Sequence, residues 1–379
     1  MSNPIVTTPT ALVTVPQLTQ DPDYSQFQFR PERVVYHGVF AAGLQWLQGR
    51  AKSDRVVDIG TVKICPNGQI TIGPTTFDAT KWAFEELCAR LGIPCPFAQK
   101  IPPDLLLHTI TRLIQEAAVG GGTSIQFHFS SYSGQDVIIG CTKEGYQFVE
   151  ATDFLTAVAA MDGNGYTLHD LIYTDRLIDV DLQIDNQVIT TTAGPKYKVL
   201  INLRSSDCGD VNPTARLGLF DTQGGTCVLS TEWGRVDRIR NKKMSIETTF
   251  ASFMGKVVEM IVPGTQLQAS LNTANTKCPT DLEVKNYYGT FNRAIDNKDT
   301  IDSLLGWTED ERKAIFKDIT VRKKNNALNK LQGLTIVPDP VLNFTQRQLA
   351  GFATDYAKNA VIEEREALRR LGGSFISLG

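Results

Sequence analysis

The sequence contains no long apolar run, no closely paired cysteines and no large excess of one charge. No stretch approaches the roughly eighteen apolar residues of a membrane-spanning helix. The segment from Met1 to Thr10 lacks the basic region and apolar core of a secretory signal. The seven cysteines are odd in number, and no two have the two-residue separation of a zinc knuckle or redox motif. These absences predict a protein without a membrane partner or disulfide framework, whose thiols are reduced and mostly buried.

Residue patterns that mark common catalytic centres are also missing. The four histidines are far apart in the sequence, and His128 alternates with Phe127 and Phe129, which predicts that it faces solvent. There is no Gly-x-Ser-x-Gly motif. The glycine run that ends at Gly122 has no lysine and follows a predicted helix, unlike a phosphate-binding loop. We therefore favour a protein without a catalytic centre, and we expect no cofactor.

Composition places the chain among ordinary folded proteins. Hydrophobic residues make up 42% of the 379 residues, and charged residues make up 21%. The net charge is −3 and the pI is near 5.9, so the molecule as a whole does not attract nucleic acid or an anionic membrane. Any surface for nucleic acid would have to be a local basic patch.

Strand signals come first in the chain and helix signals follow. Residues 1–30 are rich in Thr, Pro, Gln and Asp and predict an extended arm. Several segments of residues 31–243 alternate apolar and polar side chains, and Asn67-Gly68 between two β-branched runs predicts a hairpin. Helical patterns dominate residues 244–379. This order predicts an α+β fold, with a mostly antiparallel sheet core and a helical C-terminal part packed on it.

Capping residues mark several of the predicted helix starts. Asp78 is placed to cap a helix that begins after it. Thr308 and Glu311 have the spacing of a capping box, which satisfies two backbone amides at a helix start. Thr345 and Gln348 have the same spacing, and apolar residues then follow one helical stripe to a glycine pair near the end of the chain. We therefore predict one terminal helix, followed by an apolar tail that packs into the body.

Three segments between roughly residues 75 and 379 carry a resemblance to a known family. They are a helix pair, a strand with its turn, and the terminal helix with its tail: Leu91-Gly92-Ile93-Pro94-Cys95-Pro96-Phe97 through Ile101-Pro102-Pro103-Asp104-Leu105-Leu106, then Val199-Leu200-Ile201-Asn202-Leu203-Arg204-Ser205-Ser206-Asp207-Cys208-Gly209, then the terminal helix and Leu371-Gly372-Gly373. These segments resemble, in motif and order, the phage- and plasmid-borne family called domain of unknown function 932. The resemblance implies a mobile-element origin and a cytoplasmic location, in the host cytoplasm for a phage protein. It implies no particular activity.

Positive side chains gather in two short runs. The first follows an aromatic residue and consists of Trp233, Arg235, Arg238, Arg240, Lys242 and Lys243. An aromatic beside such a run can stack on a base while the cations neutralise phosphates. The second run, Arg322-Lys323-Lys324, lies in the predicted helix that starts near Glu309, where cations also favour the helix dipole. The alternative for the first run is a solvent-exposed connector whose charges keep the surface soluble. Whether the two runs share one face stays open.

Acidic residues on one predicted strand suggest a metal site. Asp179 and Asp181 alternate, with Asp185 beyond them, so all three point to one face of the strand. Two such carboxylates can share a hard cation such as Mg²⁺. More commonly such a row is the solvated face of a sheet. Asp207 and Asp210, in a glycine-containing turn, could join the pair.

These observations favour a nucleic-acid-associated protein that binds single strands through phosphates and base stacking during replication, recombination or annealing. We expect homo-oligomers, formed by pairing of sheet edges or by exchanged arms. The alternative is a structural phage protein that assembles into a ring, shell or filament, which would place it in the virion. A second alternative is a metal-dependent enzyme that uses Asp179 and Asp181.

Overall fold

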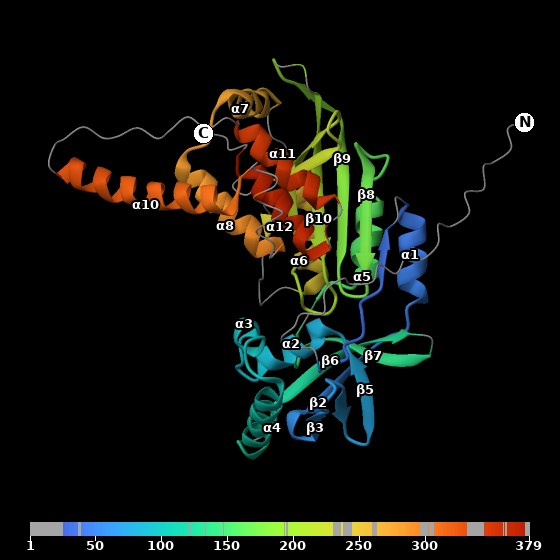
Figure 1. Cartoon of the computed structure of the whole chain (residues 1–379). Helices are drawn as coiled ribbons and strands as arrows, with labels where there is room; N and C mark the ends of the chain where they lie inside the picture. The colour runs from blue at the N-terminus through green and yellow to red at the C-terminus, as the bar shows by residue number, and fades with distance from the viewer. Residues whose placement is uncertain are drawn as a thin grey trace, which may run out of the picture.

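The computed structural model describes most of the chain. The described residues are 26–36, 39–120, 123–132, 134–146, 148–192, 194, 196–229, 236–237, 245–259, 264–295, 302, 307–331, 345–358, 360 and 362–375. They form two mostly antiparallel sheets and a set of helices that dominate the chain after residue 245 (Figure 1). This arrangement confirms the predicted α+β fold with its helical C-terminal part. Of the predicted arm, residues 1–25 lie outside the described residues.

The large sheet has the strand order β1-β8-β9-β10-β11-β12, and β13 also pairs with β11. Its strands are β1 (Val34–Tyr36), β8 (Tyr166–Thr174), β9 (Ile178–Thr190), β10 (Lys196–Ser205), β11 (Thr214–Asp221), β12 (Thr226–Leu229) and β13 (Val236–Asp237). Every pair in it is antiparallel. Consecutive strands from β8 to β12 are neighbours, because short connections favour antiparallel partners.

The small sheet has the strand order β2-β6-β7-β5-β4-β3. Its strands are β2 (Lys52–Asp58), β3 (Val62–Ile64), β4 (Ile70–Ile72), β5 (Thr75–Ala79), β6 (Ser124–Tyr132) and β7 (Gln135–Lys143), with a 3-10 turn, η2 (Ile59–Thr61), before β3. Gly68, in the turn between β3 and β4, has a φ of +86°, a left-handed conformation that glycine adopts without strain. The antiparallel β3–β4 pair confirms the predicted Asn67-Gly68 hairpin.

Three helices lie beside the small sheet in the chain order, and the first of them begins directly after β5. They are α2 (Lys81–Arg90), α3 (Cys95–Ala98) and α4 (Pro103–Val119). Thr80 caps α2, since its side chain accepts a hydrogen bond from the Ala83 amide at 3.2 Å. The prediction that Asp78 caps this helix is wrong, because Asp78 still belongs to β5 and pairs with Val137 of β7.

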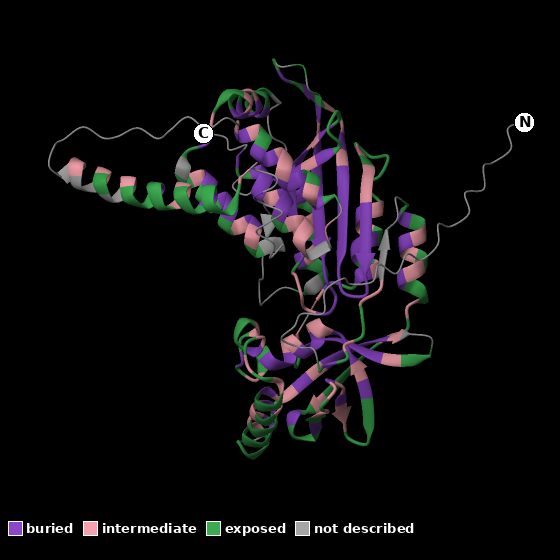
Figure 2. Cartoon of the chain, in the orientation of Figure 1, coloured by how far each residue is buried: buried purple, intermediate pink, exposed green. Residues whose placement is uncertain are grey.

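The remaining helices belong to the large sheet. They are α1 (Phe40–Gly49), α5 (Ala151–Ala159), α6 (Ile246–Val258), α7 (Gly264–Thr276), α8 (Asp281–Ile295), α10 (Glu309–Leu331), α11 (Gln346–Ala357) and α12 (Ile362–Gly373). One face of the sheet is apolar, and there Gly43 of α1 lies beside Leu155 of α5 and Leu171 of β8. α11 and α12 lie in front of the sheet, whereas α10 extends away from the body and is largely exposed (Figures 1 and 2).

The C-terminal segment forms two helices, which corrects the prediction of a single terminal helix. Thr345 and Gln348 make the predicted capping box at the start of α11. A Cβ on Gly372 would lie 2.7 Å from the Thr354 side chain, so the end of α12 returns to the middle of α11. Eighteen residues in one straight helix would separate these positions by about 27 Å. Packing of the two helices against each other therefore requires the break, which no Pro or Gly marks in the sequence.

Buried apolar side chains form two main clusters, one for each sheet. The cluster of the large sheet also includes the C-terminal helices, and Phe375 at the start of the predicted apolar tail is 6% exposed. Residues 31–243, expected as one sheet-rich core, thus supply strands to two sheets with separate cores. Of the later helices, α6, α7, α11 and α12 contact the large sheet, whereas α8 packs on α12 and α10 extends from α8.

Alanine at Gly218 should destabilise the large sheet. A Cβ there would lie 2.5 Å from Leu200 Cδ1 and 3.0 Å from the Val228 carbonyl oxygen, so backbone would have to move. Such overpacking lowers the free energy of unfolding by about 1–3 kcal/mol. Gly255→Ala is the matched control, because this α6 glycine has no neighbour within 4 Å of its Cβ position and alanine favours helix. Urea denaturation measures both, and equal midpoints would contradict the close packing at Gly218.

Candidate functional site

The first predicted basic run lies outside the described residues. Its members are in the connection between β12 and α6, on either side of β13: Trp233, Arg235, Arg238, Arg240, Lys242 and Lys243. The second run is part of α10. Arg322 lies four residues after Asp318 and pairs with it at 2.8 Å, and Lys323 and Lys324 follow in the same helix.

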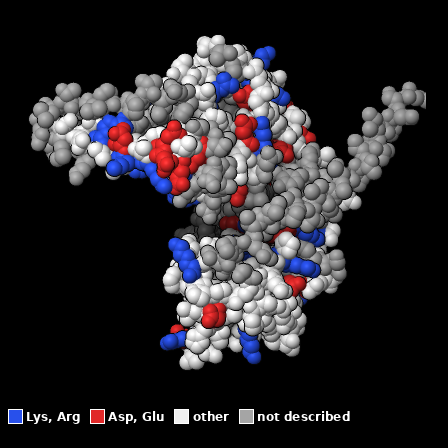
Figure 3. All heavy atoms as spheres, viewed as in Figure 1, with Lys and Arg blue, Asp and Glu red and all other residues white. Residues whose placement is uncertain are grey.

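Charge is distributed unevenly along α10. Its first turn carries Glu309, Asp310 and Glu311, whereas no acidic residue follows Asp318 up to the end of the helix at Leu331. Figure 3 shows basic and acidic side chains together on the projection, with the larger acidic patch on the side near the body. The distal half of the helix is therefore a basic segment that projects away from the body.

The base of α10 is held firmly by polar and aromatic contacts. Arg312, 8% exposed, pairs with Asp302 and donates a hydrogen bond to the Tyr288 hydroxyl of α8 at 2.7 Å. Phe316 packs edge-on against Tyr288, and Ile319 is fully buried. Val321, by contrast, is 49% exposed, whereas the Arg322 side chain is only 11% exposed. The anchored base thus extends to about residue 322.

Asp179 and Asp181 do not lie on a solvated face. They are 4% and 2% exposed, because α12 covers this side of the large sheet. Asp181 accepts hydrogen bonds from Arg369 of α12 at 2.6 Å and from Asn202 of β10 at 2.8 Å. The same Asn202 amide lies 2.5 Å from Asp179, whose other oxygen is 3.5 Å from Arg204 Nε. The expectation of solvent exposure is therefore corrected.

Further ion pairs complete this buried network. Glu366 of α12 pairs with Arg204 of β10 and with Arg216 of β11. Arg365 of α12 lies 2.5 Å from Asp170 of β8. The second face of the large sheet is therefore ionic, and a single helix supplies charges of both signs to it.

Electrostatics favour the charged state of this network. Burial alone raises the pKa of the Asp181 carboxyl, but the charges of Arg369 and Arg365 outweigh it and hold the pKa below its ordinary value. Burial lowers the pKa of Arg369, but the Asp181 carboxylate raises it well above the usual range. Within the described part of the chain, no group of three or more His, Cys, Asp and Glu residues could hold a metal. Arginines occupy the counter-charge positions, so this geometry gives the metal hypothesis no support.

A small polar cavity lies between this ionic face and α12. Its volume is about 160 Å³. The lining comes from β8, β9, β11, β12 and the two C-terminal helices, and its members are His169, Asp170, Asp181, Phe220, Gly225, Cys227, Thr354, Ala357, Lys358, Arg365 and Arg369. Burial raises the pKa of the Cys227 thiol to about 12, so this cysteine is protonated at neutral pH. The ionisable groups of the lining are thus three basic side chains, two carboxylates, one histidine and one neutral thiol.

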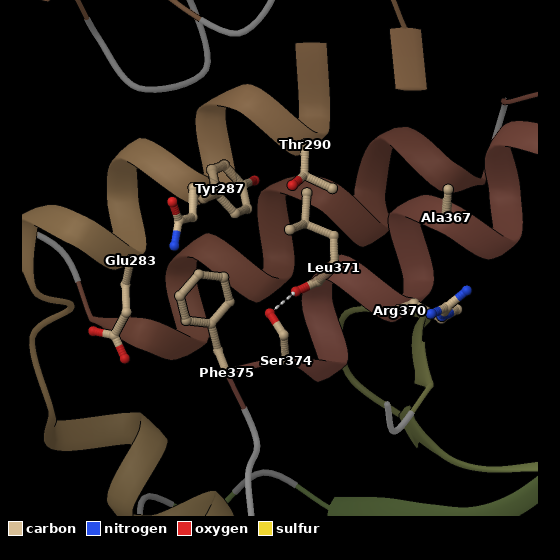
Figure 4. Close-up of a pocket in the computed structure, with 9 residues that line it drawn as sticks. Glu283, Tyr287, Thr290, Ala367, Arg370, Leu371, Ser374 and Phe375 are labelled. Carbon is tan, nitrogen blue, oxygen red and sulfur yellow. Dashed lines mark hydrogen bonds between the residues drawn. The ribbon is translucent and has the colours of Figure 1, made fainter. Parts of the chain in front are cut away.

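A larger cavity of about 470 Å³ lies between α8 and the other side of α12 (Figure 4). Tyr287 of α8, Leu371 of α12 and Phe375 form its apolar walls. Glu283 at one end is already used, since it accepts hydrogen bonds from the Thr280 amide at 2.6 Å and from Gln346. Ser374 donates to the Leu371 carbonyl oxygen at 2.7 Å. The polar groups at this groove thus serve mainly to fix the helices that form it.

Arginine–carboxylate pairs also join the two sheets. Asp175, fully buried between β8 and β9, accepts hydrogen bonds from Arg33 and from Ser130 of the small sheet. Arg50 lies 2.5 Å from Asp207. Asp210 pairs with a different arginine, Arg176, whose guanidinium lies 4.8 Å above the Trp82 ring. Asp207 and Asp210 therefore belong to the junction of the sheets and do not join Asp179 and Asp181.

His128 is fully buried, which corrects the expectation that it faces solvent. Its Nδ1 lies 3.0 Å from Asp54 Oδ1, and its Nε2 lies 3.0 Å from Thr142 Oγ1. The turn after β10 covers this face of the small sheet, since the Cβ position of Gly209 is 2.5 Å from the Thr142 side chain. The Asp–His–Thr chain therefore links three neighbouring strands of the small sheet, β2, β6 and β7. Alternation in β6 placed His128 on the correct face, but the sequence did not show that this face is covered.

Comparisons with known protein families, curated proteins and solved structures find no match for this chain. The resemblance to domain of unknown function 932 therefore stays a prediction. No helix among the described residues is long and apolar enough to span a membrane. The functional argument accordingly depends on the charges, cavities and exposed elements of the structure.

Asparagine at position 181 should destabilise the protein strongly at pH 7. Loss of the Asp181 carboxylate leaves Arg369 buried without its counter-charge, which lowers the free energy of unfolding by about 3–5 kcal/mol. Asp185→Asn is the matched control on the same strand, because Asp185 is less buried and is hydrogen-bonded by Thr167. Urea denaturation compares the two, and equal losses would contradict a structural role for the Asp181–Arg369 pair.

Acid should reduce the difference in stability between the wild type and Asp181→Asn. The folded-state pKa of Asp181 lies below its unfolded value, so its stabilising effect is complete above the unfolded pKa of about 3.9 and is lost as pH falls through the folded pKa. The free energy of unfolding should therefore decrease more steeply below about pH 4 in the wild type than in Asp181→Asn. Denaturation curves from pH 2 to pH 7 test this, and parallel profiles would refute it.

Proposed function

We propose that this protein binds nucleic acid, preferably single strands, as a non-enzymatic factor in replication, recombination or annealing. The observation that supports the proposal is α10, which projects from the body and is basic along its distal half. The molecule as a whole does not attract a polyanion, because its net charge is −3. Binding is therefore local to basic segments. The first basic run, residues 233–243, belongs to the proposal from its sequence alone.

The position of the cations in α10 argues for an external partner. Favourable interaction with the helix dipole is confined to the last turn. That turn contains Lys330, whereas Arg322-Lys323-Lys324 lie about two turns before the end of the helix at Leu331. The dipole therefore does not explain the central run. Cations arranged along a projecting helix can contact successive phosphates without reading base edges.

The size of the helix suits such contacts. Its 23 residues extend about 34 Å. The anchored base, where Arg312 pairs with Asp302, fixes the direction of the helix without occupying its basic end. From the sequence we also expect a phage or plasmid origin and assembly into homo-oligomers.

Reversal of charge in α10 should weaken binding and reduce its salt dependence. In the triple variant Arg322→Glu/Lys323→Glu/Lys324→Glu, loss of three phosphate contacts should reduce the slope of log K against log salt by about 2. Affinity for a fluorescent single-stranded oligonucleotide, measured by anisotropy across a salt series, gives both quantities. Arg238→Glu/Lys242→Glu tests the first basic run in the same way.

The matched control is Lys63→Glu/Lys100→Glu/Lys143→Glu. It changes the net charge equally but alters exposed lysines of the small-sheet body. If both triple variants weaken binding to the same extent, overall charge rather than α10 governs it, and the proposal fails. Absence of any salt-sensitive binding by the wild type would also refute it. Mass photometry with and without the oligonucleotide reports whether assembly depends on nucleic acid.

A further inference from the structure

We propose that the cavity between α12 and the ionic face of the large sheet binds a phosphate group. Its walls bring together Arg365 and Arg369 of α12 and Lys358 at the end of α11. The site is separate from α10, so the inference goes beyond the proposed function and does not depend on it.

Arg369 is the central group of this site. It is 2% exposed, and its Nη2 atom contacts Asp181 and Cys227. Its Nε and Nη1 atoms are buried and have no hydrogen-bond partner within the described structure. A buried donor without an acceptor costs about 1–3 kcal/mol. A ligand with several acceptor oxygens at this guanidinium would remove that penalty, and guanidinium geometry matches a phosphate well.

Two further cations adjoin Arg369. Arg365 lies one helical turn earlier, on the same face of α12, and is 3.9 Å from Asp181. Lys358 donates a hydrogen bond to the Gly224 carbonyl oxygen at 2.7 Å, which holds its ammonium beside the turn between β11 and β12. Three cations therefore line the cavity with two carboxylates, Asp170 and Asp181, and Lys358 also pairs with Asp355 at 2.9 Å. The two donors of Arg369 that have no acceptor, flanked by these cations, select an anion.

The size of the cavity narrows the class of anion. A volume of about 160 Å³ holds a tetrahedral oxyanion with its first waters. It is below the roughly 300–1,000 Å³ of sites that enclose whole organic ligands. The rings of His169 and Phe220, with centroids 4.2 Å apart, form one wall. The site therefore suits inorganic phosphate or the terminal phosphate of a longer molecule that remains outside.

Titration with sodium phosphate at constant ionic strength tests the site on the whole protein. Calorimetry should show saturable binding, and the unfolding midpoint should rise with phosphate relative to sodium chloride. Arg365→Gln should raise the dissociation constant at least tenfold. Lys358→Gln should raise it several-fold, and it provides a second variant because the Lys358 side chain is 41% exposed and bears little on folding. Arg370→Gln is the matched control, since this arginine of the same helix lines the other cavity.

Two competition experiments distinguish a nucleic-acid end from free inorganic phosphate as the ligand. Competition by a 5′-phosphorylated oligonucleotide, but not by its 5′-hydroxyl form, identifies the end of a nucleic acid as the ligand. Binding of inorganic phosphate without such competition identifies a free anion. Either result supports the site. The proposal is overturned if phosphate has no effect beyond that of chloride, or if Arg365→Gln and Lys358→Gln both bind phosphate like the wild type. The α10 triple variant should bind phosphate normally, which distinguishes failure here from failure of the proposed function.

Discussion

Burial of charge on the second face of the large sheet is the constraint on which the rest of the fold depends. Asp179, Asp181 and Arg204 lose their hydration there, and isolated charges in such a place are strongly unfavourable. Only a partner that presents charges of both signs can compensate them. α12 does so with Arg365, Glu366 and Arg369 in little more than one turn. The C-terminal helix therefore completes the sheet, and its charges define its position more narrowly than apolar contacts would.

The same principle separates the cations of this protein by role. Arginines at the junction of the sheets and under α12 are close to carboxylates and serve the fold. The distal half of α10 differs, because no acidic residue follows Asp318 in that helix. Arg322 pairs with Asp318 within the helix, and the lysines that follow it have no acidic neighbour later in the helix sequence. The proposal for nucleic acid therefore depends on the basic sequence of the projecting segment rather than on the arginines of the body.

The sequence predicted the features that depend on neighbouring residues. Alternation defined the strands, Asn67-Gly68 marked a hairpin, and the Thr345–Gln348 spacing marked a helix start. Features that depend on distant residues were not predictable. Asp181 in an alternating strand has the pattern of a solvated face, and its partner Arg369 lies 188 residues later. The division of the terminal helix likewise follows from packing between its halves. The fold class was therefore accessible, whereas the ionic face and its cavity were not.

Because α12 contacts the sheet on one side and α8 on the other, it connects both candidate sites. Arg369 holds the ionic face, while Leu371 two residues later faces α8 across the larger cavity. α8 in turn anchors α10 through Tyr288 and Arg312. The ionic face, the larger cavity and the base of α10 are therefore connected through two packed helices, α12 and α8. A change in the position of α12 would reach all three, because each uses side chains of α12 or of the helix packed on it.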